Sequence, residues 1–181
     1  MHRRDVIRSL SAVLALPFVR TAEEAAAIGE AVHRSLPQQP VYRTFDAAQQ
    51  QLVEMLADRI LPATDTPGAL DVQVPAFIDR LVTEWYEPAD AHSFVAGLTA
   101  IDDRARAAGG ATFVSLSDAA KTDLMGALDA QDAAGSPAGL AFRQLKSLTV
   151  FGYFTSERVA KDVLRTQIMF PQYDGCAPVR A

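Results

Sequence analysis

Apolar residues in this chain recur three or four positions apart, and this spacing constrains the fold more than any other feature. Leu52, Val53 and Leu56 form one such set, and Leu98 and Ile101 belong to another. This period places side chains on one face of an α-helix, whereas a half-buried strand needs alternation with a period of two. No stretch alternates convincingly in that way. The sequence therefore predicts an all-α fold.

The helical stretches are separated by short segments rich in proline and glycine, namely Pro62–Pro75, Gly109-Gly110 and Gly135-Ser136-Pro137. Residues of these types end helices and form turns. We expect an ordered Pro/Gly loop at the first segment and a non-regular tail after Phe170, where the periodicity ends. With 181 residues, the chain is long enough for a single compact helical domain.

Some helix starts and faces can be predicted from individual residues. Asp46 followed by Gln49 is a capping-box pattern, and Ser117 is a second candidate N-cap. Pro75 suits the first turn of a helix, because its missing N–H group has no partner there in any case. On that helix we expect one apolar face, formed by Phe77, Ile78, Leu81, Val82 and Trp85.

The N-terminus carries paired arginines, Arg3 and Arg4, before an uncharged apolar run from Ser9 to Val19. A membrane-spanning helix needs about 20 apolar residues, so this run is too short to span a bilayer. The layout is typical of a twin-arginine signal, which exports proteins that are already folded. The alternative is an amphipathic N-terminal helix that happens to start with Arg-Arg.

The export interpretation divides the chain into three parts. We expect a signal region at residues 1–27, a helix and linker at 28–44, and the helical domain at 45–181. The small residues between Ala22 and Ala27 fit a cleavage site in several windows, so the sequence leaves removal of the signal open. We expect a periplasmic protein without a transmembrane segment of its own.

Motifs for catalysis and cofactor binding are missing from the sequence. It has no G-x-G-x-x-G after a strand, no phosphate-binding loop, no Cys-x-x-Cys-His and no Gly-x-Ser-x-Gly. With only three histidines and one cysteine, we expect no catalytic, cofactor-binding or metal site in this chain. The net charge of −5, without a basic stripe, argues against nucleic acid as a partner.

Two functions from other classes remain open. A stand-alone exported enzyme would use carboxylates such as Asp65 and Asp79, and it would need a polar pocket where acids converge. A free-standing helical binding protein of the cell envelope would be monomeric and stable without a partner.

Three segments resemble a known family. The first is Arg59–Ala69 (RILPATDTPGA) running into Val74–Asp79, the second is Leu145–Glu157 (LKSLTVFGYFTSE), and the third is Pro171–Pro178 (PQYDGCAP). Together with the paired arginines, they are similar to the gluconate 2-dehydrogenase subunit 3 family. The likeness covers most of the chain from about residue 45 onwards.

The resemblance implies an accessory role. Family members are small subunits of periplasmic dehydrogenases that oxidise sugars, sugar acids or polyols. The large subunit is a flavoprotein of the glucose-methanol-choline oxidoreductase (GMC) type and holds FAD, and a cytochrome c with haem often takes the electrons onward. The small subunit carries the export signal, so it would escort and stabilise the flavoprotein. The family offers no agreed catalytic residue in this subunit.

If a partner subunit exists, the aromatic residues near the C-terminus and Cys176 are candidates for contact with it. Candidate interface residues, besides the loop Pro62–Leu70, are Phe151, Tyr153, Phe154, Phe170 and Tyr173; the alternative is that they pack in the core of this domain. The lone Cys176 allows no internal disulfide. It either packs as a small apolar side chain or forms an inter-subunit disulfide after export.

Overall fold

The computed structural model describes residues 21–130 and 135–165, and every regular element in these ranges is helical. The α-helices are α2 (Ala22–Ser35), α3 (Ala47–Ile60), α4 (Val74–Trp85), α5 (Pro88–Ala107), α6 (Asp118–Asp129), α7 (Pro137–Phe154) and α8 (Glu157–Asp162). Two short 3-10 helices, η1 (Leu70–Val72) and η2 (Phe113–Ser115), lie in connections. The predicted all-α fold is confirmed.

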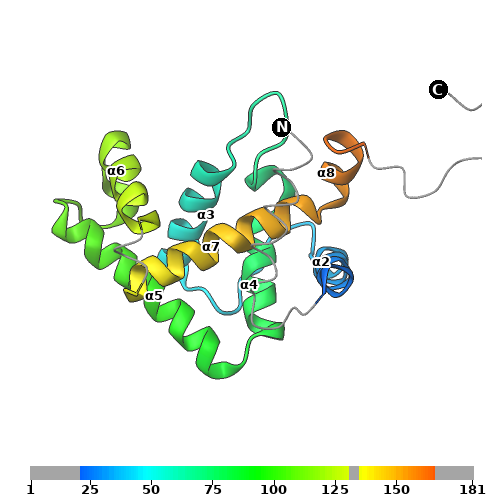
Figure 1. Ribbon diagram of the computed structural model, residues 1–181, viewed down its shortest axis with the longest axis horizontal. Helices are drawn as coiled ribbons and strands as arrows, with labels where there is room; N and C mark the ends of the chain where they lie inside the picture. Colours follow the sequence, from blue (N-terminus) through cyan, green and yellow to red (C-terminus); the bar gives the residue numbers. More distant parts are fainter. Residues whose placement is uncertain (1–20, 131–134, 166–181) are drawn as a thin grey trace, which may run out of the picture.

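Helix α7 crosses the middle of the molecule and packs against α3, α4, α5, α6 and α8 (Figure 1). Neighbours on several sides bury its side chains, among them Phe142, Leu145, Leu148 and Phe151. A helix covered on several sides must be apolar around most of its circumference, and the sequence of α7 is accordingly poor in charge. The other helices each need only one apolar face, which they bury against α7 or its neighbours.

The predicted helix starts are confirmed. Asp46 Oδ1 accepts hydrogen bonds from Ala48 N and Gln49 N at 2.9 Å each, and Asp46 N donates to Gln49 Oε1 at 3.1 Å. Ser117 caps α6, and Pro75 lies in the first turn of α4. These contacts satisfy backbone N–H groups that have no partner within the helix.

The apolar face of α4 is shorter than the sequence predicts. Phe77 and Leu81 are fully buried, whereas Trp85 is 41% exposed. Helix α4 ends at Trp85, and the next residue, Tyr86, turns inward instead: it is 8% exposed, and its hydroxyl accepts a hydrogen bond from Gln144 Nε2 at 2.6 Å. Helical spacing shows which residues share a face, but it does not show where the core ends.

Helix α2 packs against α4 and the end of α7. Ala25, Ile28 and Val32 belong to the hydrophobic core. His33 stacks on the ring of Phe77 at 4.6 Å between centroids. Its Nε2 donates to the backbone oxygen of Gly152 at 2.7 Å. The expected boundary between residues 27 and 28 falls inside this helix.

Helices α5 and α7 approach closely at Gly97, so adding one methyl group there should strongly reduce the stability of the fold. A Cβ atom on Gly97 would lie 2.5 Å from Ala141 Cβ and 2.9 Å from Pro137 O, so Gly97→Ala should lower the free energy of unfolding by about 1–3 kcal/mol. Gly126, within α6, is the matched control because a Cβ there meets nothing within 4 Å. Gly126→Ala should raise the free energy of unfolding by about 0.4–1 kcal/mol. Urea unfolding of both variants measures the difference, and equal effects would contradict this packing.

The contact of His33 predicts a pH-dependent stability. Burial lowers the pKa of His33 from its usual 6.5, because the imidazolium loses hydration; the hydrogen bond to Gly152 acts in the opposite direction. The unfolded chain therefore takes up a proton first as the pH falls. The free energy of unfolding should decrease as the pH drops through about 6.5 towards the lower folded-state pKa.

Urea unfolding at several pH values between 7.5 and 5.5 measures this effect. His33→Gln keeps an N–H donor but does not titrate, so its stability should fall less steeply with pH than that of the unaltered protein. One proton accounts for a difference in slope of at most about 1.4 kcal/mol per pH unit. Identical slopes would show that His33 is not the titrating group.

Candidate functional site

The loop between α3 and α4 is closed by its own backbone. Ala69 N donates to Leu61 O at 2.8 Å, and Gly68 N donates to Asp71 Oδ2 at 2.8 Å. At Gly68 the chain passes so close to itself that a Cβ atom would lie 2.5 Å from Ala63 N. Only glycine fits at this position without a backbone shift, so the loop is ordered as expected from its proline and glycine content.

The turn between α7 and α8 holds this loop from the other side. Tyr153 Oη donates to Pro67 O at 2.7 Å, across 86 positions of sequence. Arg158 Nη1 donates to Asp71 O at 3.4 Å. Ser156 stabilises the turn, because its hydroxyl donates to Tyr153 O at 2.8 Å and caps α8. Two distant sequence segments therefore form one continuous surface, residues 61–72 with 153–158, which we call the loop–turn surface.

The loop–turn surface combines apolar and charged groups. Leu70 is 45% exposed, and Pro62 and Ala63 on the same loop are exposed as well. The side chains of Asp71 and Arg158 are exposed beside them. The loop and α8 lie at the same end of the molecule in Figure 1. The loop–turn surface thus presents an exposed leucine bordered by charged groups, on a backbone that hydrogen bonds hold in place.

The aromatic residues that we expected at an interface differ in how deeply they are buried. Phe151 is 2% and Tyr153 is 5% exposed, so both rings lie within the core of this chain. Phe154 is half-buried and packs edge-on against Tyr153 at 5.2 Å between centroids. Tyr153 contributes to the loop–turn surface through its hydroxyl, which fixes the loop. Phe170, Tyr173 and Cys176, like Arg3 and Arg4, lie outside the described residues.

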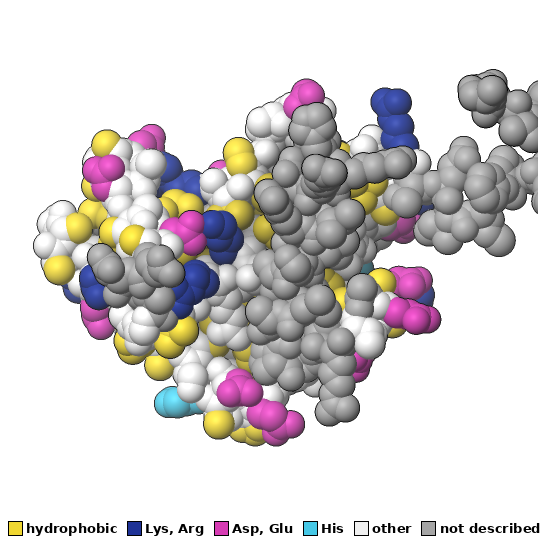
Figure 2. All heavy atoms as spheres, in the orientation of Figure 1, with side chains coloured by type: hydrophobic (Ala, Val, Ile, Leu, Met, Phe, Trp, Pro, Cys, Tyr) yellow, Lys and Arg dark blue, Asp and Glu magenta, His cyan; other side chains and the backbone are white. Residues whose placement is uncertain are grey.

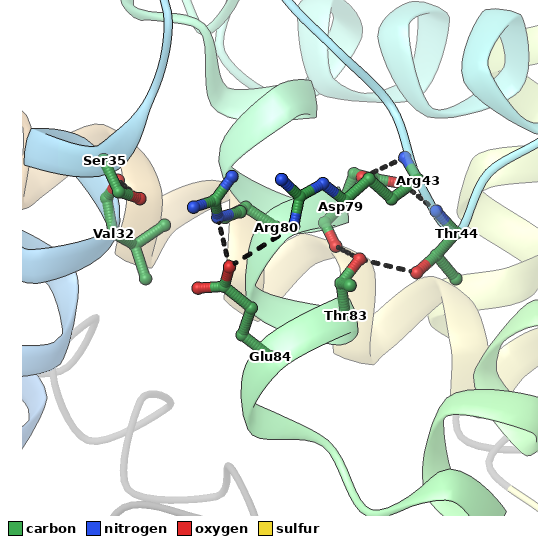
Figure 3. A network of polar contacts seen from close by, with 8 residues as sticks. All are labelled: Val32, Ser35, Arg43, Thr44, Asp79, Arg80, Thr83 and Glu84. Atoms are coloured by element: carbon green, nitrogen blue, oxygen red, sulfur yellow. Dashed lines mark hydrogen bonds and ion pairs between the residues drawn. The ribbon is translucent and has the colours of Figure 1, made fainter.

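The side chain of Asp79, on α4, is hydrogen-bonded to the backbone of the linker between α2 and α3 (Figure 3). Its side chain is 1% exposed, and its two oxygens accept hydrogen bonds from three successive backbone groups: Arg43 N at 2.8 Å, Thr44 N at 3.0 Å and Phe45 N at 2.8 Å. A buried carboxylate is stable only when it is hydrogen-bonded in this way. Asp79 therefore fixes the linker against α4 and is poorly placed for acid–base catalysis.

Asp65 has different surroundings from Asp79. It is exposed in the loop, and its Oδ1 accepts a hydrogen bond from the hydroxyl of Thr64 at 3.0 Å. A pair of carboxylates that works in acid–base catalysis must line one shared pocket, where one acts as the acid and the other as the base. The contacts of these two residues give no support to the stand-alone enzyme that the sequence left open.

The histidines in the described ranges do not gather with other ligands. His33 is hydrogen-bonded to Gly152, and His92 is exposed on α5. Within residues 21–130 and 135–165, no three His, Cys, Asp or Glu side chains are grouped so that they could hold a metal ion.

No helix in these ranges is both long and apolar enough to cross a membrane. Acidic and basic side chains are interspersed over the coloured part of the face in Figure 2.

Several residues of the site are not predictable from sequence. Asp71 and Arg158 meet only through tertiary contact, and no local pattern marks either of them. Gln73 adopts the left-handed backbone conformation at φ 56° and donates from Nε2 to Gln38 O at 3.0 Å. A glycine or asparagine would have indicated such a conformation, whereas glutamine does not.

Comparison with known protein families identifies one that covers most of the chain. A family model described as gluconate 2-dehydrogenase subunit 3 matches residues 47–171, which is more than half of the chain. The matched range contains both halves of the loop–turn surface. No curated protein and no solved structure matches this chain. The chain belongs to the gluconate 2-dehydrogenase subunit 3 family.

Proposed function

We propose that this chain is the small, non-catalytic subunit of a periplasmic dehydrogenase complex that oxidises a sugar or sugar acid. Membership of the family is the observation that carries the proposal, since the family is named for a subunit of a gluconate dehydrogenase. The site chemistry supports it: the buried acid Asp79 fixes the chain's own backbone, and the ordered surface at the end of α7 suits protein contact.

The catalytic work belongs to a partner of the GMC flavoprotein type, which holds FAD. The sequence of this chain carries no dinucleotide-binding signature, which supports placing the flavin in another chain. A cytochrome subunit with haem c is the natural acceptor for the electrons that leave the flavin. Substrate specificity would then lie in the flavoprotein, because the sugar must meet the flavin there.

The loop–turn surface is the part of this chain that we assign to the flavoprotein contact. The loop is already fixed by Tyr153, Gly68 and Asp71, so binding orders little additional backbone. Preorganisation of this kind raises affinity, because less conformational entropy is lost on association. Leu70 supplies an apolar side chain for a pocket on the partner.

Export explains why a non-catalytic subunit is needed. FAD is inserted in the cytoplasm, so the flavoprotein must fold there and cross the membrane folded. A partner with Arg3-Arg4 ahead of a short apolar run could direct the assembled complex to the twin-arginine route. The interface must survive translocation, which favours an extensive and stable contact.

A charge placed on Leu70 tests the assigned contact. Leu70→Glu should reduce the amount of flavoprotein that copurifies with the tagged small subunit about tenfold or more, because the carboxylate would be desolvated in the interface. Leu140→Glu is the matched control: Leu140 is 52% exposed and lies on α7 about 20 Å along the helix axis from Tyr153. Flavin absorbance of the purified material measures the recovered partner.

Both substitutions replace an exposed leucine, so both variants should keep the thermal stability of the isolated subunit. Equal recovery of flavoprotein with Leu70→Glu and Leu140→Glu would place the interface elsewhere on the subunit while leaving the complex itself intact.

Cell fractionation tests the export role. An Arg3→Lys/Arg4→Lys double variant should leave the flavoprotein in the cytoplasm, since the paired arginines are the recognised part of such signals. Arg20→Lys, a change of the same type outside the pair, should leave export unchanged. Flavin-dependent dehydrogenase activity in the periplasmic and cytoplasmic fractions is the measurement. Normal periplasmic activity with the double variant would refute the escort role.

A further inference from the structure

Helix α2 contains the sequence Ala25-Ala26-Ala27, which has the small-residue pattern of a signal cleavage site. A cut after Ala27 would leave a chain that begins at Ile28. In the structure, however, Ala25 and Ile28 are core residues, 3% and 5% exposed. The same short sequence thus fits two incompatible roles, a processing site and part of the folded domain.

The backbone around these residues is fully helical. Thr21 caps α2, since its Oγ1 accepts a hydrogen bond from Glu24 N at 3.1 Å, and Ala25 N donates to Thr21 O at 3.0 Å. Glu23 and Glu24 lie in the first turn, where negative charge is favourable. A protease acts on segments that open transiently from the folded state, so it reaches these bonds only when α2 leaves the core.

A cut after Ala27 would also damage the fold that remains. It would remove the Thr21 cap, both glutamates and Ala25. It would place a new α-ammonium group on Ile28, which is buried, and at a helix N-terminus, where positive charge is unfavourable. The remaining segment, 28–35, would have to hold His33 and Val32 in place with little helix of its own.

We propose that α2 is an integral part of the mature subunit, and that any proteolytic maturation takes place before Thr21 and not within residues 22–28. The proposal rests on the export role proposed above in so far as it concerns a signal. The structural part of the proposal does not depend on export: docking of α2 on α4 and α7 should protect the peptide bonds of Ala25–Ala27 in the folded chain in any compartment.

The mass of the protein recovered from the periplasm tests the proposal directly. We expect a chain that begins at or before Thr21, including the case of an uncut chain. A product whose first residue lies between Ala22 and Ile28 would overturn it. A chain that stays in the cytoplasm would contradict the export role alone, and the next experiment then decides.

Limited proteolysis of the purified full-length chain is independent of export. Elastase cuts after small residues, so it can cut after Ala25, Ala26 and Ala27 wherever they are accessible. In the folded protein we expect these bonds to survive, as judged by intact mass. Fast cutting there in the unaltered protein would overturn the proposal.

Two adjacent substitutions provide the matched controls for this experiment. Val32→Asp places a charge at a position that is 2% exposed and should undock α2, so cutting between residues 25 and 28 should become at least about tenfold faster. Ala31→Asp places the same charge at an exposed position of the same helix and should leave the bonds protected. Far-ultraviolet circular dichroism establishes that Val32→Asp keeps its other helices. Equal cutting of the two variants would show that docking of α2 does not protect the site.

Discussion

Phe77 lies against Gly152, and three helices are positioned by this contact. A Cβ atom on residue 152 would lie 2.7 Å from the ring of Phe77, so α4 and α7 approach as closely as they do only because the residue is glycine. The same ring stacks on His33 of α2 and meets Phe151 edge-on at 5.5 Å between centroids. Close packing of this kind tolerates little change in volume. It fixes the end of α7, and with it the place from which Tyr153 reaches the loop.

Polar side chains fix two connecting segments, the linker after α2 and the loop between α3 and α4, to the packed helices. In the linker after α2, the backbone N–H groups of Arg43, Thr44 and Phe45 donate hydrogen bonds to the buried carboxylate of Asp79. In the loop between α3 and α4, the hydroxyl of Tyr153 donates a hydrogen bond to the carbonyl oxygen of Pro67. Each contact joins residues far apart in the sequence, so the packed helices help to hold the linker and the loop in place.

Prediction from sequence succeeded where the signal is local. The capping pair Asp46 and Gln49 and the apolar period of the helices follow from contacts within a few residues, and the structure confirms them. Trp85 was predicted on the apolar face of α4 and is 41% exposed, because the end of the core depends on how Tyr86 and α5 meet α7. Of the candidate interface residues, Phe151 and Tyr153 are buried in this chain, and sequence alone offered no way to separate a core aromatic from an exposed one.

The sequence by itself determined the class of the fold, the position of most helices, the loop that contains Pro62, Pro67 and Gly68, and the family, because periodicity, capping and short motifs are properties of neighbouring residues. Only the tertiary structure decided that residues 61–72 and 153–158 form one surface, that Asp79 fixes backbone, and that residues 22–27 belong to a packed helix. These outcomes depend on burial and on contacts between distant segments. Such contacts exist only after the chain has closed upon itself, so no pattern along the sequence can state them.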